Sequence, residues 1–298
     1  MGAIARMIAW FAVLAERGRF IVSGPYPADQ RWRLAVVVGL FAALYVASAI
    51  PACWRRGLLA AWLLVPAGAV VIMRGGMLGL AAVPTDVWGG LPLTLLIATV
   101  GFATALPAGV ALALGRRSRL PVVRLVSGCY VELLRAVPLV TLLFMASVMF
   151  PLFVPANVTI DKLVRAQAAF SLVLSAYIAE VVRGGLAGIP AGQYDAAASL
   201  GLGYWPTTFG VTLPQALRAS VPALVNTFVG FFKDTSLVAV IGLFDLLGTA
   251  RAVAVDPHWL RSAPRIYLFV AVIYFLFCYV MSHGSRRLEA WWRDREAQ

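Results

Sequence analysis

The feature that most restricts the fold of this chain is a set of long runs without any Asp, Glu, Lys or Arg. These runs cover residues 34–54, 87–115, 136–160 and 266–285. Each is near or above the ~18–20 residues that an α-helix needs to cross the hydrocarbon of a bilayer. Only 13% of the residues are charged, whereas a soluble domain has about 25%. The sequence therefore predicts an all-α transmembrane protein.

Seven spanning segments are expected, at residues 34–51, 57–73, 89–115, 129–150, 166–187, 214–232 and 264–283. Arginines gather at residues 55–56, 116–124 and 286–295, and an alternating topology puts all of these on one side. Cytoplasmic loops carry an excess of Lys and Arg, so this side is assigned to the cytoplasm together with residues 188–213. The formal charge of +12 is explained in this way, without nucleic acid as a partner. The short apolar segment 4–14 is interpreted as an interfacial helix or as the late start of a longer chain.

No residue pattern indicates catalysis or a metal site. The cysteines and histidines lie far apart and lack the spacing of metal ligands; they are Cys53, Cys129, Cys278, His258 and His283. Neither lysine, Lys162 or Lys233, belongs to a GxxxxGK[ST] phosphate-binding loop. A chain of this kind cannot hydrolyse ATP by itself, and no cofactor is expected on it.

The segment 184–214 is rich in glycine and lies between two apolar runs. Its alanines after Asp195 favour a short helix, with the acidic residue near the helix N-terminus. Gly201 and Gly203 are expected to end that helix. Leu213 and Pro214 are expected to open the next spanning helix, because proline is tolerated at a first helical position.

The spacing within this segment resembles the cytoplasmic signature of type I ABC importer permeases, in the polar and general L-amino acid uptake branch. Asp195-Ala196-Ala197 is followed at the family's intervals by Gly201, Val211 and Leu213-Pro214; Asp195 replaces the usual Glu. The resemblance implies a coupling helix that docks on an ATPase subunit. The residues implied in coupling are Gly192, Gln193, Tyr194, Asp195, Ala196, Ala197, Gly201, Leu213 and Pro214.

Residues 130–139, 177–185, 214–218 and 233–237 also resemble this family, and the resemblance extends over about residues 88–289. It implies a membrane domain of five helices at residues 87–285. An N-terminal extension with about two further transmembrane helices would occupy residues 1–86, and a cytoplasmic tail residues 286–298.

The function implied by the resemblance is that of a multi-pass permease subunit in the bacterial inner membrane. A periplasmic binding protein would deliver L-amino acids, and a cytoplasmic ATPase dimer would supply ATP and Mg. A second, similar but distinct permease and the surrounding lipid complete the expected partners. Alternatives are a permease restricted to glutamate, glutamine, aspartate and asparagine, or a secondary transporter. The sequence shows no repeated halves or coupling-ion site for the latter, no channel filter, and no enzyme constellation.

Two pairs of opposite charges stand three residues apart, Glu132 with Arg135 and Glu180 with Arg183. That spacing places each pair on one helix face, for structural pairing or for a gating contact. A second polar group follows the apolar segment 214–232 and is expected to line the substrate path or to pair internally, since polar groups at membrane depth are costly. It consists of Asn226, Thr227, Lys233, Asp234, Thr235 and Ser236.

Overall fold

The computed structural model describes residues 16–53, 56–77, 79–155 and 157–296. The apolar segment 4–14 and Arg55 lie outside the described residues. The α-helices are α2 (Arg31–Ala49), α3 (Arg56–Arg74), α4 (Gly90–Arg116), α5 (Pro121–Ala136), α6 (Leu139–Phe144), α7 (Phe150–Phe153), α8 (Lys162–Ala187), α9 (Ala191–Ser199), α10 (Tyr204–Pro206), α11 (Leu213–Asp234), α12 (Leu246–Ala254) and α13 (Ala263–Glu296). A two-residue strand, β1 (Phe244–Asp245), precedes α12.

Six helical stretches of the described chain are long and apolar enough to cross a membrane. They are Ala28–Ala49, Gly57–Arg74, Gly90–Arg116, Lys162–Ala187, Tyr204–Ile241 and Leu260–Arg287. The all-α transmembrane fold with two additional N-terminal helices is thereby confirmed. The last predicted span, 264–283, belongs to a longer helix, because α13 runs on to Glu296 without a break at residue 285.

The predicted span 129–150 is wrong as a single helix. The α5 segment and the following segment Leu139–Phe153 meet at an angle of 99°. Val137, with φ −93° and ψ 130°, is extended, as expected for a residue whose α conformation is disfavoured by the following proline ring. Pro138 then stands immediately before α6. The α5 helix thus begins near the arginine-rich loop and ends at residue 136. After the turn at residues 137–138, the segment Leu139–Phe153 runs nearly perpendicular to it.

A π-helix over Met145–Met149 continues α6 and joins it to α7. Pro151 has no N–H to donate to the carbonyl of Ser147, four residues earlier. That carbonyl instead accepts a hydrogen bond from Nη1 of Arg165 on α8. The bent segment is therefore fixed to α8 at the point where its own hydrogen bonding is interrupted.

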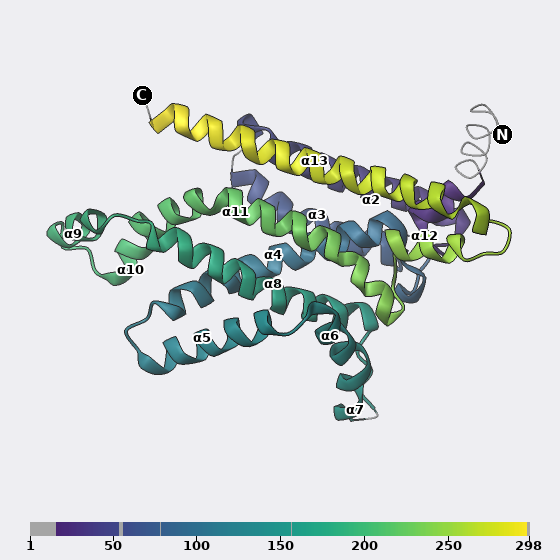
Figure 1. Ribbon diagram of the computed structural model, residues 1–298, viewed down its shortest axis with the longest axis horizontal. Helices are drawn as coiled ribbons and strands as arrows, with labels where there is room; N and C mark the ends of the chain where they lie inside the picture. The colour runs from purple at the N-terminus through teal and green to yellow at the C-terminus, as the bar shows by residue number, and fades with distance from the viewer. Residues whose placement is uncertain (1–15, 54–55, 78, 156, 297–298) are drawn as a thin grey trace.

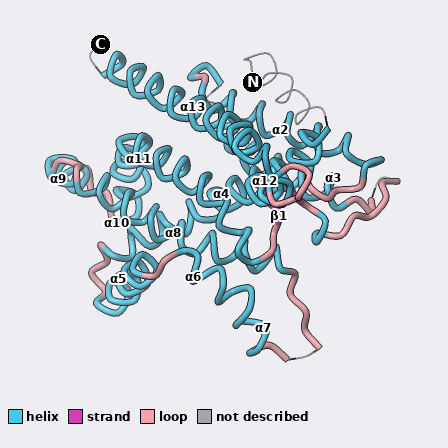
Figure 2. The backbone as a smooth tube through the Cα atoms, turned by 45° about the vertical axis from the view of Figure 1, so that its right-hand side comes forward, coloured by secondary structure: helices cyan, strands magenta, loops and turns pink. Residues whose placement is uncertain are grey.

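The helices form three layers, which Figures 1 and 2 show from two directions. The α4, α8 and α11 helices lie in the centre, with α5 on one side and α2 and α13 on the other. Close approach in the central layer depends on glycine: a Cβ added to Gly109 of α4 would lie 2.6 Å from Cγ2 of Ile178 on α8. Small residues at helix crossings are typical of packing in membranes, where backbones approach closely.

The N-terminal helices α2 and α3 are joined to the centre by an aromatic cluster around Phe228 of α11. The ring of Phe228 lies 5.8 Å from that of Tyr45, 5.7 Å from Trp62 and 5.0 Å from Phe102. The Tyr45 hydroxyl and Thr99 Oγ1 of α4 are also 2.6 Å apart in the buried interior. The extension and the central helices share one hydrophobic core.

At the end of the bundle that holds α12, three distant segments meet. Gly90 has φ +65°, and a Cβ there would lie 2.0 Å from the carbonyl oxygen of Val22. Thr249 Oγ1 donates to the carbonyl of Ile21 at 2.7 Å. Asp245 is fully buried and accepts hydrogen bonds from the N–H groups of Leu247 and Gly248, so that it caps α12. Burial raises the pKa of Asp245 to about 6.

Candidate functional site

The helix predicted from the alanines after Asp195 is α9, and it protrudes from one end of the bundle (Figure 1). It begins at Ala191, so Asp195 lies in its middle and not near its N-terminus as expected. Gly201 has φ +71°, and its N–H bonds to the carbonyl of Ala198 at 2.9 Å while that of Leu202 bonds to Ala197 at 3.0 Å. This pair of bonds is a Schellman motif. Gly203, with φ −71°, does not share in it.

The next span begins earlier than the sequence indicates. Helical structure starts at Tyr204, passes through a π-helix at Thr207–Thr212 and continues into α11 at Leu213. Pro214 therefore lies inside a continuous helical rod. Its missing N–H falls directly after the π turn, where the regular hydrogen-bond ladder is already displaced.

The α9 helix contacts the bundle at few points. Nη2 of Arg117, after the end of α4, donates to the Tyr194 hydroxyl at 3.2 Å. Nε2 of Gln215 on α11 donates to Oε1 of Gln193 at 3.1 Å, and Ala197 is buried. The other small side chains of the helix are exposed, and the neighbouring Leu200 is 79% exposed. A largely unoccupied surface of small and apolar residues thus faces away from the bundle.

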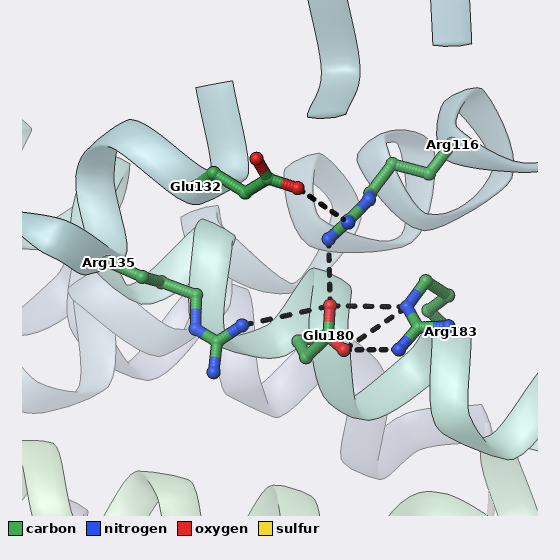
Figure 3. A network of polar contacts seen from close by, with 5 residues as sticks. All are labelled: Arg116, Glu132, Arg135, Glu180 and Arg183. Carbon is green, nitrogen blue, oxygen red and sulfur yellow. Dashed lines mark hydrogen bonds and ion pairs between the residues drawn. The ribbon is translucent and has the colours of Figure 1, made fainter. Parts of the chain in front are cut away.

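Beneath this helix lies the charge network, defined as Arg116, Glu132, Arg135, Glu180 and Arg183 (Figure 3). Glu180 Oε2 is 2.8 Å from Nη1 of Arg116 and 3.8 Å from Nη1 of Arg135. Arg183 is ion-paired with the same carboxylate. The network joins the end of α4 to α5 and α8.

The predicted pairing within this network is correct for Glu180 with Arg183 and wrong for Glu132 with Arg135. Glu132 instead reaches Nη2 of Arg116 at 3.2 Å. Arg116 was predicted only as a loop arginine. Its position directly after the charge-free run 87–115 is the signal that could have placed it at a helix end near the other charges.

A cavity of about 470 Å³ adjoins the network where α5 breaks. Arg135 belongs to its lining, with Cζ 5.5 Å from the centroid of the Tyr177 ring. Its lining comes from α5, the break, α8 and α11, and consists of Arg135, Ala136, Val137, Pro138, Leu139, Val173, Tyr177, Thr227, Gly230, Phe231 and Asp234.

Two of the predicted substrate-path residues, Thr227 and Asp234, line this cavity. The remaining four are absent from its lining. Thr235 is fully buried and donates to the carbonyl of Phe232 at 2.8 Å, while Asn226 and Lys233 are exposed elsewhere on α11 and Ser236 is half-buried after it. Sequence reasoning missed Arg135 and Tyr177 as cavity residues because the break at residues 137–138 was not anticipated.

No group of three or more His, Cys, Asp or Glu side chains suited to a metal ion occurs in the part of the chain that the structure describes. The arrangement instead offers an open cavity lined mainly by apolar residues, together with the charged side chains of Arg135 and Asp234, and a protruding helix with an exposed face. These features are typical of a membrane transport subunit.

The chain belongs to the family described as "Binding-protein-dependent transport system inner membrane component", whose model matches residues 105–294. A coupling helix is typical of this family, and α9 contains residues 192–197, which the sequence resemblance implies in that role. The family consists of non-catalytic permease subunits in the inner membrane.

Two curated relatives cover nearly the whole chain. The Escherichia coli K12 protein "Inner membrane amino-acid ABC transporter permease protein YhdY" is 50% identical over 94% of this chain and 77% of its own length. The Rhodobacter capsulatus protein "Glutamate/glutamine/aspartate/asparagine transport system permease protein BztC" is 39% identical over 96% of this chain and 68% of its own length.

Among solved structures, an amino acid ABC transporter crystallised with histidines matches 69% of this chain and 92% of its own with a TM-score of 0.59 and 28% identity. A subunit of the MetNI methionine transporter covers 66% of this chain and 91% of its own with a TM-score of 0.50 and 18% identity. The second likeness shows the fold alone.

Proposed function

We propose that this chain is the membrane-spanning subunit of an ATP-driven importer for L-amino acids. The proposal is supported by relatives whose names state amino acid transport. The observation that carries it is the cavity at the break of α5, whose lining includes both a cation, Arg135, and a carboxylate, Asp234. An amino acid presents the complementary pair of charges.

The chemistry of the cavity suits a zwitterion of this size. Arg135 offers a planar guanidinium for the α-carboxylate, which it can bind with two parallel hydrogen bonds. Asp234, on the opposite helix, offers a carboxylate for the ammonium group. The volume of the cavity, about 470 Å³, lies in the range of small-molecule pockets. Val173 and Phe231 supply apolar walls for the side chain of the ligand.

Coupling to ATP would occur through α9. Its exposed small side chains allow close docking of a cytoplasmic ATPase dimer, which would hold ATP and Mg in place of this chain. We assign this end of the bundle to the cytoplasm because Arg116, Arg117, Arg119 and Arg124 gather there. A periplasmic binding protein would then deliver amino acids at the α12 end. The division into residues 1–86, 87–285 and 286–298 stays a prediction.

A second permease subunit, similar to this chain but distinct, would cover the α5 face. Glu132 is 74% exposed there although it belongs to the charge network. A carboxylate facing lipid is costly, and such groups normally face protein or water. Exposed leucines occur on both helices, Leu125 and Leu133 on α5 and Leu59 and Leu63 on α3. The exposed carboxylate of Glu132 is therefore what favours a protein partner on the α5 face.

A narrower substrate range, restricted to four amino acids, is the alternative to transport of L-amino acids in general. The name of the Rhodobacter capsulatus relative specifies glutamate, glutamine, aspartate and asparagine. Competition among the twenty amino acids for uptake distinguishes this range from a general one.

The test is reconstitution in proteoliposomes with the ATPase, the second permease and the binding protein. Uptake of labelled amino acid should require all of these and internal ATP. Ala196→Trp, on the exposed face of α9, should abolish ATP-dependent uptake, whereas Ala60→Trp on the exposed side of α3 should not. Uptake driven by an ion gradient without ATP would overturn the proposal.

A further inference from the structure

The charge network contains more positive than negative charge. Its arginines are Arg116, Arg135 and Arg183, whereas its carboxylates are Glu132 and Glu180 alone. Glu180 contacts all three guanidinium groups (Figure 3). One guanidinium thus lacks a carboxylate of its own within the network.

Arg135 is the arginine that is held least tightly. Its Nη1 lies 3.8 Å from Glu180, beyond hydrogen-bond distance, whereas Arg116 is at 2.8 Å. Its side chain is 39% exposed and lines the cavity. Among these arginines, it is the one that can turn toward another anion at the smallest cost in lost contacts.

Arg135 contacts two side chains of α8, Tyr177 and Glu180, but forms no hydrogen bond with Glu180. Tyr177 and Glu180 are three residues apart, so both face the same side of α8. The guanidinium lies over the Tyr177 ring and near the Glu180 carboxylate at once. A cation over an aromatic ring keeps its hydrogen-bond donors free at the edge of the guanidinium plane.

We propose that Glu180 is the counter-ion of Arg135 in the absence of substrate. The α-carboxylate of the amino acid takes the place of Glu180 beside Arg135 on binding, and Glu180 pairs with Arg135 again on release. This inference rests on the proposed function. Binding supplies the negative charge that the network lacks, so that each guanidinium then has a carboxylate. Glu180 acts through Arg135 and is a positioning residue that sets both carboxylate selectivity and the rate of release.

The sign of its effect separates this role from a structural one. Replacing Glu180 by glutamine removes the competitor for Arg135 and makes the cavity more positive. We expect the free amino acid to bind about tenfold more tightly, because a unit charge about 4 Å from the guanidinium is lost. The α-methyl ester, which carries no carboxylate charge, should bind as it does to the unaltered complex. Maximal uptake should fall, since release becomes slow.

The experiment measures binding to the purified permease–ATPase complex without binding protein, by calorimetry. The probes are the amino acid that the unaltered complex binds most tightly among the twenty and its α-methyl ester. Glu132→Gln is the matched control, because Glu132 belongs to the network but contacts Arg116 and not Arg135. Its preference for free acid over ester should equal that of the unaltered complex.

Arg135→Gln keeps the test decisive if Glu180→Gln does not assemble, because it should abolish the preference for the free acid. Equal weakening of acid and ester in Glu180→Gln, or an unchanged preference in Arg135→Gln, would overturn the inference and leave the proposed function standing. If no amino acid binds or is taken up by the unaltered complex, the proposed function fails as well.

Discussion

Arg117 and Tyr194 contact each other between the end of α4 and the coupling helix. Nη2 of Arg117 donates to the phenol oxygen at 3.2 Å, and its Cζ lies 5.8 Å from the ring centroid. The preceding residue, Arg116, donates to Glu180 at 2.8 Å. Two successive arginines therefore join the coupling helix to the charge network beside the cavity.

Loss of the Arg117–Tyr194 contact should weaken coupling between ATP hydrolysis and transport. Tyr194→Ala removes both the hydrogen bond and the ring, which together contribute about 1 kcal/mol at an exposed site. We expect uptake per ATP hydrolysed to fall about threefold to fivefold in proteoliposomes. Tyr194→Phe keeps the ring and should show a smaller loss. Tyr267→Ala, at an exposed position of α13, serves as control; an unaltered ratio in Tyr194→Ala would contradict the prediction.

Asp245 should make stability depend on pH in an unusual direction. Burial raises its pKa from the ordinary 3.8 to about 6, so the folded protein binds this proton more tightly than the unfolded chain. Its contribution to stability is therefore largest below about pH 4, falls as the pH rises to about 6 and stays low above that. The loss at neutral pH amounts to about 2–3 kcal/mol.

Asp245→Asn should remove this dependence while keeping a helix cap. The thermal midpoint of the variant in detergent should change less than that of the original protein between pH 4.5 and 7.5. Asp195→Asn, at an exposed position of α9, should retain the original pH response. If Asp245→Asn and the original protein responded alike, the buried carboxyl would not be the cause.

Gly109→Ala should separate α4 from α8. The added Cβ would lie 2.6 Å from Cγ2 of Ile178 and 2.9 Å from the carbonyl oxygen of Ser175, and the second atom belongs to backbone that cannot turn aside. We expect a loss of about 1–3 kcal/mol, read as a lower thermal midpoint of the detergent-solubilised protein. Gly68→Ala in α3 meets no atom within 4 Å. It should be neutral or slightly stabilising because alanine favours helix.

The spans could be predicted because charge-free length is a property of each segment alone. The break at Pro138 could not, although the proline was visible. Pro107 and Pro222 lie inside α4 and α11 without interrupting them, so proline by itself does not decide whether a membrane helix divides. The outcome depends on whether neighbouring helices cover the freed carbonyl groups, and that is a tertiary property.

The charge network shows the same limit. Spacing of three residues predicted Glu180 with Arg183 within one helix. It failed for Glu132, because Arg116 arrives from a different helix and contacts it at 3.2 Å. The cavity was only half anticipated for a related reason: Thr227 and Asp234 are close in sequence, whereas Arg135 and Tyr177 join them only through folding.

The π turn at Thr207–Thr212 fixes the azimuth of the coupling helix relative to the cavity. Successive residues of an α-helix advance by about 100° around its axis. A π turn holds one more residue than an α turn, so the helical segments on either side keep nearly the relative orientation of an unbroken helix. If this turn became α-helical without losing a residue, everything before it would rotate by about 100° around α11. Tyr194 would then point away from Arg117 although neither residue had changed. The π turn therefore keeps the two ends of the permease in register.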